Sequence, residues 1–216
     1  LDTSLYPQPV LALAASIPAA GNIMAHRITS ETDLRTNFFT LGIAESGAGK
    51  DHARECIAKS YEASGHSDYL LGDPASATGV IKSLVRTNGR GLMRIDEFGR
   101  FMDSMKGKNA ASHARQITTN MMHMYNSAKT IFTGQEYADN EAAGGRSDID
   151  QPCLNIYATT VPHRFYNAIS SEEAFDGFLS RWLVFETTRF DIDPNIDNLG
   201  RNEVPQNLSD NLKWWL

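Results

Sequence analysis

One stretch of the sequence constrains the fold more than any other. The apolar run 38–43 is rich in β-forming residues, the small residues 46–49 follow it, and Lys50 precedes the helix-compatible segment 52–59. A strand, a glycine turn and a helix in this order surround an anion with backbone N–H groups, and the lysine can reach the outer phosphate oxygens. Glycine is needed because a side chain would keep the backbone away from the ligand. The residues expected at phosphate are Ser46, Gly47, Ala48, Gly49, Lys50, Asp51 and His52.

This stretch departs from the pattern G-x-x-x-x-G-K-[ST] at two positions. Ala44 stands where the first glycine is expected, and Asp51 stands where a hydroxyl would hold Mg²⁺. A carboxylate at position 51 could still bind the metal, directly or through water, because Mg²⁺ prefers oxygen ligands. It also brings negative charge close to the phosphates. A glycine-rich turn that binds no ligand is the alternative.

A second stretch supplies acidic residues. The apolar segment 91–95 predicts a strand, and Asp96 and Glu97 follow it directly. In open α/β sheets, ligands bind beyond the carboxyl ends of the strands. Asp96 there could hold a metal ion, and Glu97 could polarise an attacking water. Adjacent carboxylates after a strand also occur as a solvated turn, but together with the lysine loop they favour a nucleotide-hydrolysing site.

Two more residues are candidates for the same chemistry. Thr160 ends the predicted strand 153–160, and its hydroxyl could meet a γ-phosphate or the attacking water, or merely cap a turn before Pro162. Arg181 lies in the apolar segment 174–185. A buried charge without a partner is costly, so Arg181 is expected to pair with a phosphate, in its own site or in a neighbouring subunit, or with a carboxylate in a structural salt bridge.

The length, the net charge and the cysteines of the chain restrict the functions that it can have. Its 216 residues carry a formal net charge of −6 and include no run long enough to span a membrane. This charge argues against a broad nonspecific nucleic-acid surface but not against a local basic channel. The weak DNA-contact candidates are Lys106, Lys108 and Arg146. Cys56 and Cys153 are expected to be buried free thiols, which fits a reducing cytoplasm.

Other elements are predicted from local pattern. We expect a helix from about Val10 to Arg27, broken or kinked at Pro18, and a helical face formed by Val80, Ile81, Leu84 and Val85. Residues 130–133 predict a strand, and 134–150 an irregular segment. The expected organisation is a helical lead-in at 1–36, an ATPase core at 37–190 and a C-terminal extension at 191–216.

The order of these parts resembles a family of phage and mobile-element primase–helicases that contain a RecA-like P-loop ATPase domain. The resemblance covers about residues 7–186 and is carried by the segments 44–50, 94–98 and 176–182. It implies an α/β, RecA-like P-loop NTPase fold with a mostly parallel central sheet flanked by helices. It also implies ATP and Mg²⁺ as cofactors, with Lys50 on phosphate, Asp96 and Glu97 serving metal and water, Thr160 as a sensor and Arg181 as an arginine finger or sensor.

This resemblance further implies a homo-hexamer or other ring that threads single-stranded DNA, works with other replication proteins and acts in the cytoplasm (of a bacterial host, if the chain is of phage origin). We therefore predict an ATP-driven DNA helicase or translocase domain, with Asp51 as a second metal ligand beside Asp96. Two alternatives stay open. One is a P-loop ATPase with a task unrelated to nucleic acid, and the other is a nucleotide-dependent assembly module with little hydrolysis, which the unusual Asp51 permits.

Overall fold

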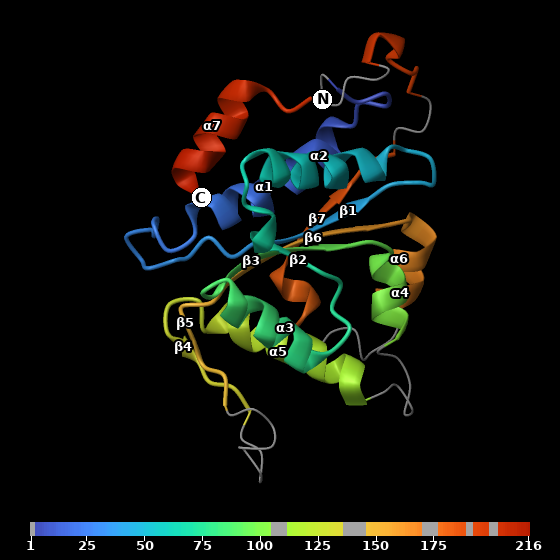
Figure 1. Ribbon diagram of the computed structural model, residues 1–216. Helices are drawn as coiled ribbons and strands as arrows, with labels where there is room; N and C mark the ends of the chain where they lie inside the picture. The colour runs from blue at the N-terminus through green and yellow to red at the C-terminus, as the bar shows by residue number, and fades with distance from the viewer. Residues whose placement is uncertain (1–2, 105–111, 136–145, 170–176, 189–191, 199–202) are drawn as a thin grey trace.

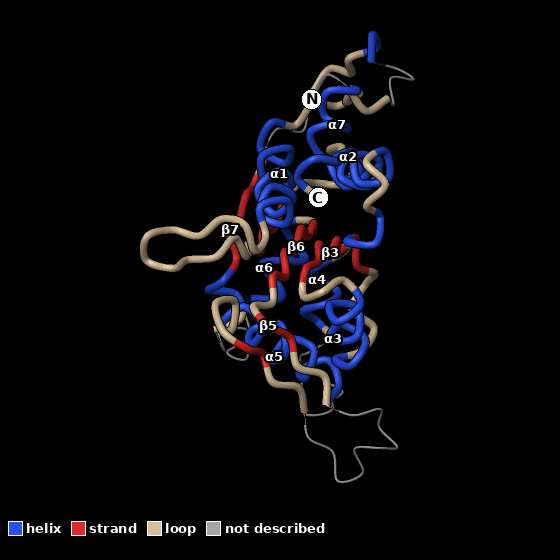
Figure 2. Tube along the Cα trace, turned by 60° about the vertical axis from the view of Figure 1, so that its left-hand side comes forward, coloured by secondary structure: helices blue, strands red, loops and turns tan. Residues whose placement is uncertain are grey.

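The computed structural model of the chain is a three-layer α/β arrangement, and it describes residues 3–104, 112–135, 146–169, 177–188, 192–198 and 203–216. Helices α1 and α2 cover one face of a central sheet, and α3 and α5 cover the other (Figures 1 and 2). The helices are α1 (Pro9–Met24), α2 (Lys50–Ala63), α3 (Ala77–Arg86), α4 (Phe98–Asp103), α5 (Ser112–Asn126), α6 (Pro162–Ile169) and α7 (Gln206–Trp215), with 3₁₀ turns η1 (Ser67–Tyr69), η3 (Leu179–Arg181) and η4 (Ile196–Asn198).

The central sheet confirms the predicted fold class at the level of an α/β protein with a parallel sheet flanked by helices. Its five strands lie in the order β2-β3-β6-β1-β7, and every pairing is parallel. The strands are β1 (Phe39–Ile43), β2 (Leu70–Leu71), β3 (Arg90–Ile95), β6 (Cys153–Thr160) and β7 (Trp182–Glu186). Because β6 lies between β1 and β3, the two strands that lead into the predicted site are not neighbours.

Strand β1 shows how the two faces differ. Phe39, Leu41 and Ile43 are buried in the core shared with α3 and α5. Thr40 and Gly42 alternate with them and face α1, because successive side chains of a strand point to opposite faces. A Cβ atom at Gly42 would lie 2.9 Å from a methyl carbon of Leu11. Glycine at this position therefore lets α1 approach the sheet.

Helix α1 runs unbroken through Pro18, so the predicted break at this residue is wrong, and the helix ends at Met24. Proline has no N–H to donate to the carbonyl four residues earlier, which is that of Ala14. The hydroxyl of Thr40 on β1 donates to this carbonyl at 2.7 Å. The sheet thus supplies the hydrogen bond that the proline removes, which the sequence of the helix alone could not indicate.

The opposite face holds the larger hydrophobic core. Ser76 caps α3 by accepting a hydrogen bond from the backbone N–H of Gly79 at 2.9 Å. Val80, Ile81 and Leu84 are buried as predicted, but Val85 is 46% exposed, so its predicted place on this face is wrong. Met121 and Met124 of α5 are fully buried against the sheet and act as core residues, consistent with their helical spacing.

Two segments lie outside the central sheet. β4 (Ile131–Phe132) pairs in antiparallel fashion with β5 (Ile149–Asp150), so part of the segment expected to be irregular forms a strand. At the chain end, α7 contacts α2 and α1, with Ser209 donating to the carbonyl oxygen of Ala63 at 3.0 Å.

Within the described residues, no helix combines the length and the apolar character needed to cross a membrane.

Candidate nucleotide-binding site

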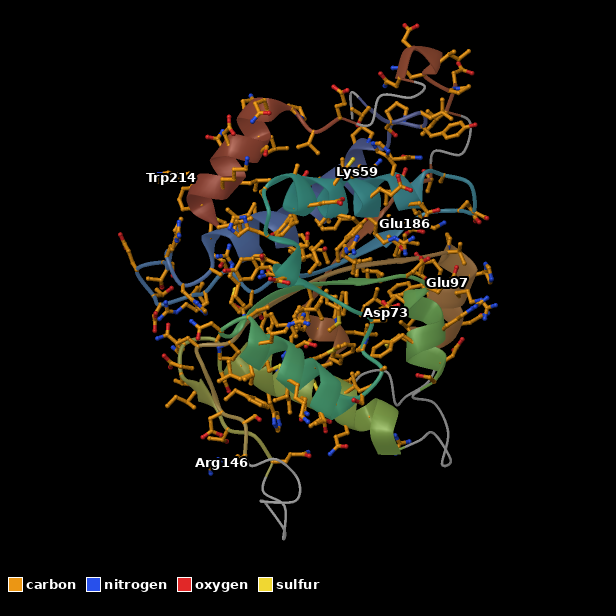
Figure 3. All side chains as sticks on the ribbon, viewed as in Figure 1. Lys59, Asp73, Glu97, Arg146, Glu186 and Trp214 are labelled. Atoms are coloured by element: carbon orange, nitrogen blue, oxygen red, sulfur yellow. The ribbon has the colours of Figure 1, made fainter. Side chains whose placement is uncertain are left out.

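The candidate site lies at the carboxyl edge of the central sheet, where β1, β6 and β3 end. The glycine loop follows β1, and Asp96 and Glu97 follow β3. Since all these strands are parallel, their carboxyl ends share one edge, and the last residues of β6 fill the space between the loop and the acidic pair. Figure 3 shows Glu97 at this edge, where α4 begins. The topology therefore brings together the two stretches that the sequence singled out.

The loop between β1 and α2 adopts a conformation that only glycine takes up easily. Gly47 and Gly49 have φ angles of 80° and 77°, in the left-handed region. The N–H of Ala48 turns back to the carbonyl of Glu45 at 3.3 Å. Within the described chain, the backbone N–H groups of Gly47, Gly49 and Lys50 have no acceptor. These donors stand at the N-terminus of a helix of 14 residues, a position that favours an anion.

Lys50 folds back over this loop. Its Nζ donates to the carbonyl oxygens of Ala44 at 2.9 Å and Glu45 at 2.6 Å. An ammonium group has three N–H donors, so one remains for another acceptor. Burial lowers the pKa of Lys50 below its usual value, and the carboxylates of nearby acidic residues, among them Asp51, Glu97 and Asp96, oppose this shift. Lys50 and the acidic pair thus lie close enough to interact electrostatically.

Asp96 is held by three donors. Its Oδ1 accepts the backbone N–H of Glu97 at 2.9 Å and the hydroxyl of Thr159 at 3.1 Å, and its Oδ2 pairs with Arg54 at 2.8 Å. Burial by itself would raise the pKa of Asp96, but these donors, and the charge of Arg54 above all, hold this pKa below its usual value. The carboxylate is therefore ionised and fixed in orientation.

The hydroxyl that contacts Asp96 belongs to Thr159, whereas the sequence singled out its neighbour Thr160. Side chains alternate along β6, and the Thr160 hydroxyl points to the other face, where it accepts the N–H of Gly99 in α4 at 3.2 Å. Thr160 retains a hydroxyl proton to donate, so its contact with a phosphate stays a prediction. Which of two adjacent threonines faces a given side depends on strand register, which the sequence does not fix.

Arg54 connects the two carboxylates that were predicted to bind metal. Its NH1 and NH2 groups lie 2.8 Å from Asp96 Oδ2 and 2.6 Å from Asp51 Oδ1. The side chain of Arg54 is only 21% exposed, while those of Asp51 and Asp96 are 75% and 50% exposed. Sequence reasoning missed this residue. The spacing of three positions between Asp51 and Arg54 on a helix could have indicated their pair, but nothing local indicates the contact with Asp96.

Glu97 has a strained backbone. Its φ of 53° and ψ of 46° place a residue other than glycine in the left-handed region. Such conformations cost about 1–3 kcal/mol and cluster at functional sites. The Glu97 side chain is 42% exposed, and its carboxylate lies 3.8 Å from the guanidinium of Arg100. The strained turn thus presents a carboxylate at the carboxyl edge beside the fixed Asp96.

Arg181 lies at the opposite edge of the sheet. It ends η3 and directly precedes β7, whose first residue pairs with Phe39 at the start of β1. Its guanidinium donates to the carbonyl of Gly177 and to Asn126 Oδ1, the latter at 2.9 Å, and lies 5.8 Å from the ring centroid of Tyr125. The structure therefore does not bring Arg181 to the glycine loop of its own chain. Its predicted action on a neighbouring subunit stays a prediction.

The other predicted residues lie elsewhere. His52 is turned toward α1, with Nε2 3.2 Å from the hydroxyl of Thr3 and 3.3 Å from Cys56 Sγ. Arg146 pairs with Asp148 at 2.8 Å and lies at the opposite end of the molecule from Glu97 (Figure 3). Lys106 and Lys108 fall outside the described residues. The structure thus places neither His52 nor Arg146 at the acidic pair.

The donor chemistry of the site fits Mg²⁺ held jointly with phosphate. No group of three or more His, Cys, Asp or Glu side chains that could hold a metal occurs in the described part of the chain. Mg²⁺ bound with a nucleotide needs only one or two protein carboxylates, because phosphates and waters complete its shell. Asp96 and Asp51 supply that number, and both now pair with Arg54. A metal ion would therefore have to displace the guanidinium from at least one of them.

Comparison with known proteins assigns no family: no protein-family model matches the sequence, and no curated protein is similar to it.

Proposed function

We propose that this chain binds Mg-ATP at the carboxyl edge of its sheet and hydrolyses it, as the motor domain of a phage or mobile-element replication protein that moves on single-stranded DNA. One observation carries the nucleotide part of the proposal: Lys50 in the glycine loop after β1 and the pair Asp96–Glu97 after β3 lie at the same carboxyl edge of the parallel sheet. The strand order, with β6 between β1 and β3, is compatible with a RecA-like fold. The DNA part rests on the sequence resemblance.

The loop residues would bind the phosphates. The N–H groups of Gly47, Gly49 and Lys50 stand at a helix N-terminus without an acceptor among the described residues, and the amine of Lys50 has a third N–H left after its two carbonyl contacts. A phosphate oxygen is a stronger acceptor for such donors than a neutral carbonyl, because a bond to an ionised group is charge-assisted. Bound phosphate would therefore compete with the carbonyls of Ala44 and Glu45 for the lysine.

Asp96 and Glu97 would have different roles in hydrolysis. Asp96, with Asp51 beside it, would hold Mg²⁺, which when bound neutralises charge on the phosphates. Glu97 would orient the attacking water and accept its proton, from the left-handed turn that precedes α4. Arg181 would act on the nucleotide of an adjacent subunit in a ring, since its place at the opposite edge excludes the site of its own chain.

The test is ATP turnover measured while single-stranded DNA is titrated, with Lys50→Ala beside the wild type. We expect DNA to stimulate turnover in the wild type, and Lys50→Ala to lose nucleotide binding altogether because the cation at the centre of the loop is gone. Lys59→Ala is the matched control, because Lys59 is on the same helix but pairs with Glu55 at 3.7 Å, away from the loop. Turnover that DNA does not change would favour an ATPase with another task. Equal nucleotide affinity in Lys50→Ala and wild type would refute the site.

A second candidate function is a nucleotide-binding assembly module with little hydrolysis, and the arginine bridge favours it. Arg54 neutralises both carboxylates that hydrolysis would need for the metal. If this bridge persists when nucleotide is bound, ATP would order the loop without being cleaved. Native mass measurement with ATP, alongside a slow hydrolysis assay, separates the two: larger assemblies without phosphate release indicate the module.

A further inference from the structure

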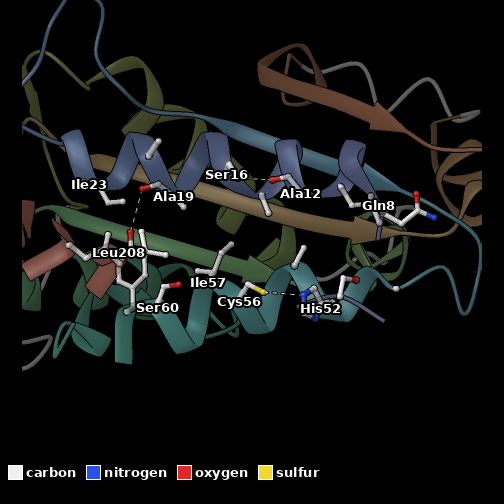
Figure 4. Close-up of a pocket in the computed structure, with 18 of the residues that line it drawn as sticks. Gln8, Ala12, Ser16, Ala19, Ile23, His52, Cys56, Ile57, Ser60 and Leu208 are labelled. Carbon is white, nitrogen blue, oxygen red and sulfur yellow. Dashed lines mark hydrogen bonds between the residues drawn. The ribbon is translucent and has the colours of Figure 1, made fainter. Parts of the chain in front are cut away.

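An apolar cavity of about 430 Å³ lies between α1 and α2. Figure 4 shows side chains of the two helices pointing toward one another across it. Leu208 and Leu212 of α7 border it as well, and Gly49 of the glycine loop lies at its margin. The main side chains of its two walls are Ala15, Ser16 and Ala19 of α1, and Ala53, Cys56 and Ile57 of α2.

The cavity exists because small residues face each other. Helix α1 is held down on the sheet through Gly42 and Thr40, and the side chains that it turns toward α2 are mostly alanine and serine. The larger side chains of the two helices that border the cavity, among them Ile23 and Tyr61, leave the space between the small residues unfilled. A cavity of this volume with a mostly apolar lining is suited to a small organic molecule, and apolar cavities in proteins take up apolar ligands readily.

A nucleophile lines this cavity. Cys56 is half-buried, with Sγ 3.3 Å from Nε2 of His52, and both residues line the wall. Burial is the main cause that lowers the pKa of His52, so this imidazole is neutral at pH 7 and can accept a proton from the thiol. The second thiol, Cys153, lies elsewhere. It is buried, and burial raises its pKa to about 11, so it stays protonated.

We propose that the cavity between α1 and α2 binds small apolar molecules, and that Cys56 adds covalently to those with an electron-poor carbon–carbon double bond. In this step the thiol proton passes to Nε2 of His52, and the sulfur forms a bond to one alkene carbon. The π electron pair moves to the neighbouring carbon and its carbonyl, and this carbanion then takes the proton back from the imidazolium. The net change is addition of S–H across the double bond, with no leaving group and no redox partner.

The experiment compares N-phenylmaleimide with the anionic reagent N-carboxymethylmaleimide on the native chain, with each rate divided by that for glutathione. Intact and peptide mass spectrometry identify the modified cysteine. We expect Cys56 to react about tenfold faster with the phenyl reagent after this correction, because burial of the phenyl ring in an apolar cavity is favourable. The rate should also saturate with reagent concentration, because binding precedes reaction. Equal corrected rates, or a rate that rises linearly without limit, would overturn the proposal.

Three variants and one competitor make the test more specific. Ala19→Phe fills the cavity and should abolish saturation, while Leu13→Phe, at a residue of α1 that is 54% exposed, should leave it intact. His52→Gln should slow the addition without changing the saturating concentration. If Ala19→Phe fails to fold, which labelling of the buried Cys153 would reveal, N-phenylsuccinimide replaces it. This unreactive analogue should protect Cys56 in the wild type, and a lack of protection would contradict the site.

Discussion

The cationic side chains at the two edges of the central sheet have different surroundings. At the carboxyl edge, Lys50 lies among Asp51, Asp96 and Glu97, beside backbone N–H donors that meet no acceptor in the described part of the chain. At the amino edge, Arg181 contacts neutral groups, namely the carbonyl of Gly177, the amide of Asn126 and the ring of Tyr125. Each cation lies close to one end of a strand, Lys50 after β1 and Arg181 before β7. What separates them is whether the residue follows its strand or precedes it.

The largest effect should come from Glu97→Gln at the carboxyl edge. The amide is nearly the same size as the carboxylate but cannot accept a proton, so nucleotide binding should persist while turnover falls by about 100-fold or more. Steady-state phosphate release and equilibrium binding of a fluorescent nucleotide measure the two effects separately. Arg100→Gln, which removes the exposed partner of Glu97, serves as control. Unchanged turnover in Glu97→Gln would remove Glu97 from the mechanism.

Arg54→Ala tests how the carboxyl edge admits a metal ion. Without the guanidinium, Asp51 and Asp96 lose their shared cation. The affinity for Mn²⁺, measured by electron paramagnetic resonance without nucleotide, should therefore rise by about fivefold, which corresponds to about 1 kcal/mol. Lys59→Ala removes a cation from the same helix and should leave this affinity unchanged. Weaker Mn²⁺ binding in Arg54→Ala would mean that the arginine orders the site and does not compete for it.

Arg181→Gln tests the amino edge. Nucleotide affinity of the isolated chain should stay within about twofold of the wild type, and stability should fall by about 1 kcal/mol through the lost hydrogen bonds to Gly177 and Asn126. Turnover should fall only at chain concentrations at which subunits associate. Binding isotherms, urea unfolding and a concentration series of turnover measure these effects. A loss of nucleotide affinity in dilute, unassociated chains would contradict the division between the two edges.

The smallest expected effect is the loss of the stabilisation by Asp96 as the pH falls. The pKa of Asp96 in the folded chain lies below the ordinary value of 3.8, so the unfolded chain takes up a proton at this residue first as the pH falls. The stabilisation is therefore complete above the unfolded value and is lost as the pH falls through the folded one. The difference in unfolding free energy between wild type and Asp96→Asn should shrink by about 0.5 kcal/mol from about pH 6 to about pH 3.

Urea titrations at both pH values measure this difference. Asp68→Asn, which changes an exposed carboxylate of η1, is the control. A difference that grows on acidification would mean that the protonated form of Asp96 is the one favoured by folding.

Much of the fold followed from local pattern. The glycines at 47 and 49 take the left-handed conformation that a tight loop needs, and the apolar runs before Ala44 and Asp96 form buried parallel strands. Pro18 was misjudged because its effect depends on Thr40, which lies 22 positions further along the chain. For Arg181 the sequence left open a phosphate of its own site or of a neighbouring subunit. A residue directly before a parallel strand lies at the amino edge, away from ligands bound at the carboxyl edge, so the contact with a neighbouring subunit stays a prediction.

The sequence by itself determined which groups end the strands, since a strand, a glycine turn, a lysine and a second strand ending in two acids can be recognised from neighbouring residues. Only the tertiary structure decided which of these groups touch. Arg54 reaches Asp96 and Thr159 reaches the same carboxylate because α2, β3 and β6 pack together at one edge. Contacts between residues this far apart, 63 positions for Thr159 and Asp96, depend on the packing of whole elements and on strand register, and neither is encoded in any short stretch of the chain.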